Sequence, residues 1–518
     1  MDHLRAYSYR CSFKMVKIIH TNSTQPTDIK NQWERDQIYN GLDCAVTLEV
    51  FNTIHSQLDA TTAETYAFSR ALQGPVLEMR CRGSLIDANR KREVINEFHD
   101  KIDYLERGLS RIVLDGVGMR SFSWRSSKQV MELFYNHLQI PIIKKQGRPT
   151  ADRDALEKVR AFTVAKPIVA HLIALRELSK KIEALEMGVD NDGRMRTSYN
   201  IAGTNTGRFS SSFSEFGTGG NFQNVEESLR SIFVADRGCK FAKFDAKSGE
   251  SYIVGAIEGN LFNDWKYLDA VESGDIHTAV ARLCWPDLGW TGDIKRDKVI
   301  AERPYYRHYD YRFMCKKLGH GSNYGGQPRR LSEETKLPER MVAGFQPKYF
   351  GAFPSHLERL KWTDNVLSRM GNLTTLTGRK RWFFGRRSDP ATQREAYAYD
   401  PQGSLADIVN RAMLRIWREH TAGAVVVFQD HDALTYMYPE EREDEVIPAL
   451  QAALPERIIL SNDRTMVIPY DCKVGWNKGN WAESNPDGLR DYTGHDQRTR
   501  TPQESELDKL LRGLNRKA

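Results

Sequence analysis

The segment AVVVFQDHDALTYMYP, residues 424–439, decides the fold class because it combines two strand-like runs with a charged turn. Runs of β-branched and aromatic residues on either side of a short polar cluster are typical of a β-hairpin. Hairpin turns usually favour Asn-Gly or Asp-Gly, whereas this turn contains Asp430, His431 and Asp432. The segment therefore predicts a hairpin whose tip has a chemical role.

A second carboxylate occupies a comparable place in KFDAKSGESYIVG, residues 243–255, where an apolar run ends at Asp245. This segment predicts a strand that turns into a helix, and an isolated aspartate at such a point is more often a helix N-cap. Because Asp432 also ends a buried strand, the two carboxylates could instead lie on neighbouring strand ends and hold two divalent cations. Magnesium prefers such hard oxygen ligands. The pair predicts a site for two Mg²⁺ ions that serves in-line phosphoryl transfer.

Four side chains recur at every fourth position in YRFMCKKLGHGSNYGG, residues 311–326: Arg312, Lys316, His320 and Tyr324. Residues four apart stay near one face of a helix. Such a row is common by chance, but two cations, an imidazole and a phenol without an acid among them make a poor solvated face. We expect the row to bind a triphosphate, with Tyr324 beneath the base or sugar.

Length and composition fit a large globular protein with several domains. The chain has 518 residues, of which 40% are hydrophobic and 28% are charged, and this is too long for one small core. It contains no apolar run of the roughly 18 residues that a membrane span requires, and its first residues lack the apolar region of a secretory signal. The seven cysteines are scattered and form no CxxC pair, so we expect neither zinc nor disulfides, and a reducing compartment.

The net charge of +7 is modest, but basic and aromatic residues concentrate in two segments. These are KRDKVIAERPYYRHYDYRFMCKK, residues 295–317, and GRKRWFFGRR, residues 378–387. Basic groups bind phosphates and aromatic rings stack on bases, so these segments could form a nucleic-acid surface. Without further signals, however, a solvated basic face with some aromatic residues in the core is the preferred interpretation.

Helical patterns dominate the rest of the chain, which predicts an α+β fold with a few antiparallel strands among many helices. The strongest amphipathic pattern is SLADIVNRAMLRIWREH, residues 404–420, and Asp87 is a predicted helix N-cap. From about residue 484 the chain is polar, which predicts a flexible tail that ends in a short helix at residues 505–514.

Taken in order, these segments resemble the motifs of family A DNA polymerases, the family of bacterial DNA polymerase I and several phage replicases. TGRFSS (206–211) and NFQNV (221–225) are similar to the family's TGRLSS and NLQNI, DIHTA (275–279) to its DIH segment, and QGSLADIVNRAM (402–413) to QGTAADIIKRAM. DAKSGE (245–250) resembles motif A, the row at 311–326 resembles motif B, RxxxKxxxxxxxYG, and HDA (431–433) resembles the HDE of motif C. Each match is weak alone, but their common order over roughly residues 70–484 is specific.

The resemblance implies a right-hand fold with an antiparallel sheet in the palm and helical fingers and thumb. The implied regions are a 3′–5′ exonuclease-like remnant at 1–60, a helical region with the thumb at 61–200, the palm at 201–274 and 399–484, the fingers with an insertion at 275–398, and a flexible tail at 485–518.

The implied activity is template-directed addition of dNTPs to a primer 3′-OH, with release of pyrophosphate. The implied catalytic residues are Asp245, Asp432 and Lys316, and the two aspartates are the implied metal ligands. The implied dNTP-binding residues are Arg312, Lys316, His320, Tyr324, Glu250, His277 and Arg230, where Glu250 would screen the sugar 2′ position. The implied DNA-binding residues are Arg208, Arg394, Gln402, His431 and Asn224. Asp430 stands where the family usually has an apolar residue and receives no catalytic role.

The sequence departs from the family pattern at four places. His320 replaces the aromatic residue that packs against the sugar, Ala433 replaces the last acid of motif C, and Gly249 replaces an aliphatic residue of motif A. The segment between His277 and Arg312 is also longer than usual, which predicts a fingers insertion that contacts template or a replisome partner.

At the N-terminus, YNGLDCAVT (39–47) resembles the third motif of the family's 3′–5′ exonuclease, with Tyr39 and Asp43 in place. That chemistry requires further carboxylates, normally a DxE pair, and none precedes Tyr39. We therefore expect no exonuclease activity in this chain, a phage-type or split replicase, and proofreading supplied by a separate subunit. The expected partners are primer–template DNA, dNTPs and replisome proteins, and the chain is expected to be a cytoplasmic monomer without membrane attachment.

Two alternatives remain open from the sequence alone. A phage-type single-subunit RNA polymerase shares the palm aspartates, but Glu250 beside Tyr324 would exclude a 2′-OH. A non-catalytic replisome scaffold could retain the fold, but it would have no need for both Asp245 and Asp432.

Overall fold

The computed structural model describes residues 32–186, 188–215, 217–306 and 309–501. At its centre lies a five-stranded antiparallel sheet with the order β13-β14-β8-β17-β18. The strands are β8 (Cys239–Ala246), β13 (Val425–Asp430), β14 (Ala433–Pro439), β17 (Tyr470–Gly475) and β18 (Arg490–Asp491). β13 and β14 form the predicted hairpin, and the sheet confirms the antiparallel strands of the predicted α+β class.

Both faces of this sheet are covered, which explains why β13 and β14 are nearly continuous apolar runs. On one face Phe244 and Leu434 are buried in a core shared with helices α9 (Gly249–Phe262) and α17 (Pro390–Glu419). On the other face Phe241 and Phe428 belong to a second core, which continues into the base of a helical arm.

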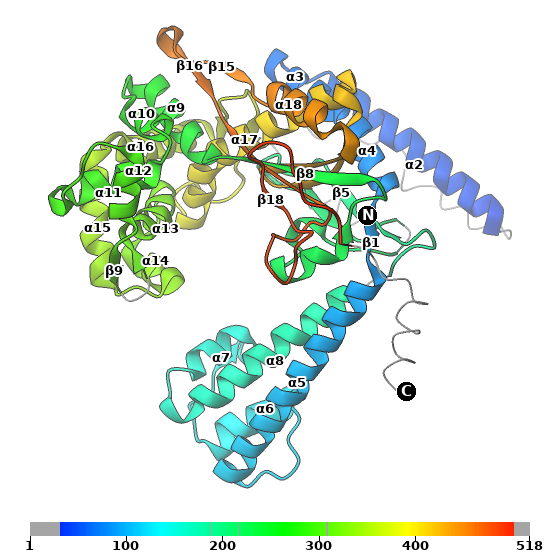
Figure 1. The fold of residues 1–518 in the computed structure, drawn as a ribbon, viewed down its shortest axis with the longest axis vertical. Helices are drawn as coiled ribbons and strands as arrows, with labels where there is room; N and C mark the ends of the chain where they lie inside the picture. The colour runs from blue at the N-terminus through cyan, green and yellow to red at the C-terminus, as the bar shows by residue number, and fades with distance from the viewer. Residues whose placement is uncertain (1–31, 187, 216, 307–308, 502–518) are drawn as a thin grey trace.

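This arm extends away from the sheet (Figure 1) and is built on two long helices, α5 (Ala88–Val117) and α8 (Lys166–Leu185). Asp87 is the N-cap of α5, as predicted, and accepts hydrogen bonds from two backbone amides of its first turn. The far end of the arm contains α6 (Ser127–Met131), η1 (Glu132–His137), β2 (Lys144–Lys145), β3 (Arg148–Pro149), α7 (Arg153–Val159) and η2 (Thr163–Ala165).

A second helical lobe, separate from the arm, follows β8 and α9 in the chain (Figure 1). It contains α10 (Lys266–Glu272), α11 (Ile276–Cys284), η5 (Pro286–Leu288), α12 (Ile294–Ala301), β9 (Pro304–Tyr306), β10 (Tyr309–Asp310), α13 (Tyr311–Asn323), α14 (Pro328–Thr335), α15 (Glu339–Ala352) and α16 (Ser355–Met370). The segment predicted as an insertion lies within this lobe and forms η5, α12, β9 and β10.

The remaining elements lie before, between and around these three parts. Before and beside the arm lie α2 (Gln32–His55), α3 (Ala60–Ala71), α4 (Gln73–Arg82), β1 (Ser84–Ile86), β4 (Arg194–Met195), β5 (Ser198–Asn200), β6 (Ser210–Ser212), η3 (Phe222–Asn224), η4 (Glu227–Ile232) and β7 (Phe233–Val234). The hairpin β11 (Asn372–Thr374) and β12 (Lys380–Trp382) precedes α17. Around the sheet lie η6 (Thr421–Gly423), η7 (Glu440–Arg442), α18 (Glu443–Ala453), β15 (Arg457–Ile459), η8 (Ser461–Asp463) and β16 (Thr465–Val467).

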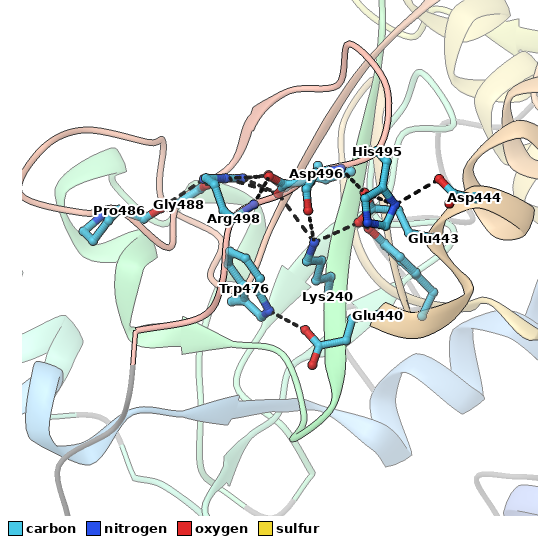
Figure 2. Close-up of polar contacts among 12 residues, drawn as sticks. Lys240, Glu440, Glu443, Asp444, Trp476, Pro486, Gly488, His495, Asp496 and Arg498 are labelled. Carbon is cyan, nitrogen blue, oxygen red and sulfur yellow. Dashed lines mark hydrogen bonds and ion pairs between the residues drawn. The ribbon is translucent and has the colours of Figure 1, made fainter.

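The prediction of a flexible tail is wrong for residues 485–501, because this segment is tied to the sheet by a buried ionic network (Figure 2). The Lys240 ammonium on β8 lies 3.0 Å from a carboxylate oxygen of Glu443 and 3.6 Å from one of Asp496. Arg498 in turn donates to Asp496 at 2.7 Å. A buried cation requires such partners, and composition could not reveal that the tail supplies one of them.

Residues 1–31 of the expected exonuclease-like remnant and the predicted short helix at 505–514 lie outside the described residues. In the part of the chain that the structure describes, no helix is long and apolar enough to cross a membrane.

Candidate active site

The two predicted metal-binding carboxylates, Asp245 and Asp432, meet at the tip of the hairpin. Asp245 pairs in register with Ala433, the residue that follows Asp432. The backbone amide of Ala246 donates to the carbonyl of Asp432 at 3.1 Å, which fixes the hairpin turn against the end of β8. Burial and the nearby charge of Asp245 raise the pKa of Asp432 above its ordinary value. Two like charges that face each other here favour the binding of a cation.

The hairpin turn is held by a chain of buried amides. His431 has a φ of 61°, the left-handed conformation of a tight turn. The side chain of Gln429 donates to the carbonyl of His431 at 2.8 Å, and Gln223 donates to Gln429 at 2.8 Å. Sequence reasoning missed these two glutamines. A signal was available for Gln429, because a polar side chain directly after the buried apolar run 425–428 requires a hydrogen-bond partner.

Asp430 has a structural partner, which agrees with its having been given no catalytic role. The ammonium of Lys478 lies 3.0 Å from the Asp430 carboxylate and 3.9 Å from the centre of the Phe428 ring. Burial lowers the pKa of Lys478, and Asp430 opposes this shift. Asp430, at a position where the family usually has an apolar residue, therefore neutralises the charge of a buried lysine. No local sequence pattern indicates that this lysine is buried.

Replacing Asp430 with alanine should destabilise the fold by about 2 kcal/mol, because Lys478 would remain buried without its counter-ion. The measurement is the free energy of unfolding in urea. The matched control is the double variant Asp430→Val with Lys478→Met, which removes both charges and should recover most of that loss. A double variant as unstable as the single one would contradict the compensating role of this pair.

Two further charged residues lie beside Asp245. Lys243 places its ammonium 3.3 Å from a carboxylate oxygen of Asp245. Asp471 on β17 is the register partner of Asp245 on the side opposite Ala433, and its side chain is exposed. Residues directly opposite each other in antiparallel strands share one face of the sheet. Asp471 therefore places an acid beside Asp245, although Ala433, on the other side, replaces the acid that motif C usually has.

Glu250, in the first turn of α9, connects three of the predicted site residues. Its carboxylate is 2.6 Å from the Arg208 guanidinium, accepts a hydrogen bond from the Tyr324 hydroxyl, and lies 3.9 Å from Nε2 of His320. Burial and the charge of Glu250 raise the pKa of Tyr324. The predicted contact between Glu250 and Tyr324 is confirmed.

The unusual glycine of motif A has a steric reason. A Cβ atom on Gly249 would lie 2.5 Å from a methyl carbon of Leu405 on α17. A larger residue would therefore require Leu405 to move, and glycine allows the close approach of α9 and α17 next to Glu250.

The row on α13 is confirmed for Arg312, Lys316 and His320, but the helix ends at Asn323, so Tyr324 is its C-cap. The row contains no acid itself, but a neighbouring helix supplies one. Arg312 donates to Asp275 of the neighbouring helix α11 at 2.8 Å. A helical pattern cannot reveal an acid that another helix supplies.

His277 lies at the N-terminus of α11 near the cations of this row. Burial, and then the charge of Arg312, lower its pKa to about 4. The imidazole is therefore neutral near pH 7 and would offer a ligand a hydrogen bond rather than a charge.

The end of α13 is fixed by a buried arginine that sequence reasoning also missed. Arg359 on α16 donates to the carbonyl of Asn323 and to the Glu258 carboxylate. This contact fixes the backbone just before Tyr324, and with it the direction of the tyrosine ring. An arginine inside an ordinary amphipathic helix gave no signal of this role.

The remaining predicted residues form no hydrogen bond or ion pair with Asp245, Asp432, Glu250 or the α13 row among the described residues. Arg230 donates to the carbonyl of Val225 at 3.0 Å, and Arg394 and Gln402 are half-buried on α17. Asn224 is exposed and lines a cavity of about 650 Å³ between α8 and η3–η4, away from the two carboxylates.

Residues 89–483 match the model of the family described as DNA polymerase family A. The chain belongs to DNA polymerase family A. Members of this family use divalent metal ions, in agreement with the two converging carboxylates. Family membership confirms the resemblance inferred from the motifs, while a phage origin and a truncated exonuclease stay predictions.

Among curated proteins, the chain is 26% identical over 428 residues to a thermostable DNA polymerase I of Thermus aquaticus, covering 78% of this chain and 47% of that protein. It is 26% identical over 471 residues to DNA polymerase I of Pseudomonas aeruginosa, covering 86% of this chain and 47% of that protein. The chain thus spans about half the length of these relatives.

Among solved structures, the polymerase domain of Pol1 from M. smegmatis, in complex with DNA primer-template and dNTP, matches with a TM-score of 0.61 and 22% identity. The match covers 79% of this chain and 69% of that one. This similarity confirms the right-hand polymerase fold, with the central sheet as the palm between two helical parts.

Proposed function

We propose that this chain is a template-directed DNA polymerase that adds dNTPs to a primer 3′-OH and releases pyrophosphate. The observation that supports it best is the meeting of Asp245 and Asp432 on adjacent strand ends within a family A fold. The same observation disfavours a non-catalytic scaffold, because two facing carboxylates destabilise the fold and a scaffold would have no use for them.

Asp245 and Asp432 would hold two Mg²⁺ ions. Their hard oxygen donors suit this cation. Burial, and then the like charge of Asp245, raise the pKa of Asp432, and a bound cation would offset that like-charge contact. When bound, such ions supply the positive charge that stabilises the attacking and leaving oxygens of the phosphoryl transfer.

On the fingers, Arg312, Lys316 and the neutral His277 would bind the triphosphate. Arg312 is held in place by Asp275, so its guanidinium is oriented before a nucleotide arrives. Lys316 carries no ion pair among the described residues, so it is the cation that can stabilise negative charge on the departing phosphates. Arg230 would add charge from the palm side.

Glu250 and Tyr324 would form the wall against which the sugar packs, with His320 beside them. The hydrogen bond between the two side chains holds a carboxylate where a 2′-OH would lie. This arrangement favours a deoxyribonucleotide substrate over the ribonucleotide of a phage-type RNA polymerase.

Primer–template DNA would contact Arg208, Arg394, Gln402, Asn224 and His431. Arg208 is paired with Glu250 in the structure, so DNA binding and sugar selection would share this arginine. His431, exposed at the hairpin tip beside Asp432, would adjoin the primer end.

We assign 61–200, which contains the arm, to a helical region that includes the thumb, 201–274 and 399–484 to the palm, and 275–398 to the fingers. The proposal also includes an exonuclease-like remnant at 1–60 and proofreading by a separate subunit. It further includes replisome contacts, a monomeric state and a cytoplasmic location. Tyr39 and Asp43 lie on α2 with exposed side chains.

Replacing His320 with tyrosine should change the use of dideoxynucleotides by about tenfold, because a larger ring would pack on the sugar near its 3′ position. The ring of His320 already lies 5.1 Å from that of Tyr324. The measurement is the ratio of kcat/KM for a dNTP and for the matching ddNTP. His320→Gln is the control without a ring, and an unchanged ratio in the tyrosine variant would mean that this position does not touch the sugar.

The experiment that tests the function is extension of a labelled primer on a DNA template with Mg²⁺, run with dNTPs and with rNTPs. Extension with dNTPs alone supports a DNA polymerase, and equal use of rNTPs supports the RNA polymerase alternative. Tight DNA binding without extension would support the scaffold. Loss of primer length in the absence of dNTPs would contradict the expected lack of exonuclease.

A further inference from the structure

The basic segment at 378–387 contains three aromatic residues, of which the fold uses one. Phe383 is 7% exposed and packs with Tyr399 of α17, their ring centres 5.9 Å apart. Trp382 and Phe384, on either side of it, are 45% and 61% exposed. One ring is therefore turned inward and two are turned toward solvent.

The two outward rings are two residues apart in the chain, a separation that corresponds to roughly 6.6 Å where the chain is extended. Nucleotides in an extended single strand can place successive bases on side chains at such intervals, and stacking on aromatic rings tolerates any base. Scattered single apolar residues on a surface need no explanation, but two neighbouring aromatic rings among cations do.

Cations surround this pair. Lys380 lies 5.7 Å from the centre of the Trp382 ring. Arg386 is exposed, and Arg387, also exposed, donates to the carbonyl of Ser368 at 2.8 Å, which holds it beside the end of α16. Lys380 also lies 3.5 Å from a carboxylate oxygen of Asp59, and Arg381 is turned toward Glu395 of α17 in an ion pair. The positive charge left to a ligand therefore comes from Arg386 and Arg387, beside the two exposed rings.

The surface is attached to the start of α17. Glu395, the partner of Arg381, is adjacent to Arg394, one of the proposed DNA contacts on that helix. A strand that reaches Arg394 is therefore near the loop that carries the two rings.

We propose that Trp382 and Phe384 form a binding surface for single-stranded DNA, namely the unpaired template ahead of the primer terminus, whose bases stack on the rings while Arg386 and Arg387 contact its phosphates. This inference rests on the proposed polymerase function. A protein partner is the other occupant that an exposed aromatic surface could have, and the positive charge favours the nucleic acid.

The test compares two duplexes that differ only in a 5′ template overhang on the order of ten nucleotides. Binding of the full chain is measured by fluorescence anisotropy without dNTPs or metal. The double variant Trp382→Ala with Phe384→Ala should bind the overhang duplex about tenfold or more weakly and bind the blunt duplex like the wild type. Trp481, which is also 45% exposed but lies on the C-terminal segment, gives the matched control Trp481→Ala, which should bind both duplexes normally.

Two further variants separate stacking from charge and from misfolding. Trp382→Phe keeps a ring and should retain most of the overhang affinity. Arg386→Ser should reduce the dependence of affinity on salt, whereas the double aromatic variant should leave that dependence unchanged.

Equal loss of affinity for both duplexes, or no loss for the overhang duplex, would overturn the proposal. The readout is independent of catalysis. If the chain does not extend primers but binds the overhang duplex more tightly than the blunt one, only the polymerase function is refuted. If the chain extends primers and the double variant binds the overhang duplex like the wild type, only this surface is refuted.

Discussion

Replacing Asp432 with asparagine should lower the rate of nucleotide incorporation by on the order of a thousandfold or more, and Asp245→Asn should do the same. Metal-assisted stabilisation of transferring phosphates is worth several kcal/mol, and each loss of roughly 1.4 kcal/mol costs a factor of ten in rate. Asparagine keeps the size of the side chain but removes the charge that binds a cation. The measurement is single-turnover extension of a labelled primer.

Both variants should bind primer–template nearly as well as the wild type, since neither carboxylate attracts the DNA backbone. Asp491→Asn is the matched control, because Asp491 lies on the edge strand β18 of the same sheet and pairs only with Lys473 among the described residues. Extension by either site variant at the rate of this control would refute the assignment of Asp245 and Asp432.

Replacing Glu250 with alanine should lower the preference for dNTPs over rNTPs by about a hundredfold, mainly through better use of rNTPs. The Glu250 carboxylate is held against the Tyr324 hydroxyl and is paired with Arg208, so it is fixed in place. Alanine removes this barrier and leaves room for a 2′-OH. The measurement is the ratio of kcat/KM for a dNTP and for the matching rNTP.

Glu250→Gln is the control for this prediction, because it retains the bulk of the side chain and should keep most of the discrimination. Tyr324→Phe, which removes only the hydroxyl that Glu250 accepts from, should give an intermediate loss. A preference unchanged in the alanine variant would mean that another residue screens the sugar.

Several parts of the site could be predicted because their signals are local. The hairpin at 424–439 follows from two apolar runs around a polar cluster, and the α13 row from a four-residue period. Asp245 and Asp432 each end a run of buried residues, so their meeting required only that the two strands be neighbours. Periodicity and turn chemistry act over a few residues, and such features can be inferred from the sequence.

The contacts that hold the site together could not be predicted in the same way. Asp275 pairs with Arg312 from another helix, and Lys478 reaches Asp430 from beyond β17. The tail at 485–501 looks flexible by composition, yet Asp496 neutralises a buried lysine. Each of these pairs joins residues far apart in the chain, so its existence depends on the packing of the whole fold.

The most direct test of the central claim, that Asp245 and Asp432 serve phosphoryl transfer to a primer, measures primer extension and pyrophosphate release in the same reaction. With Mg²⁺ and dNTPs, the account predicts one pyrophosphate for each nucleotide added, complete loss of both signals with a chelator, and their recovery when Mg²⁺ is restored. Extension that persists without divalent metal, or in the Asp245→Asn variant, would contradict it.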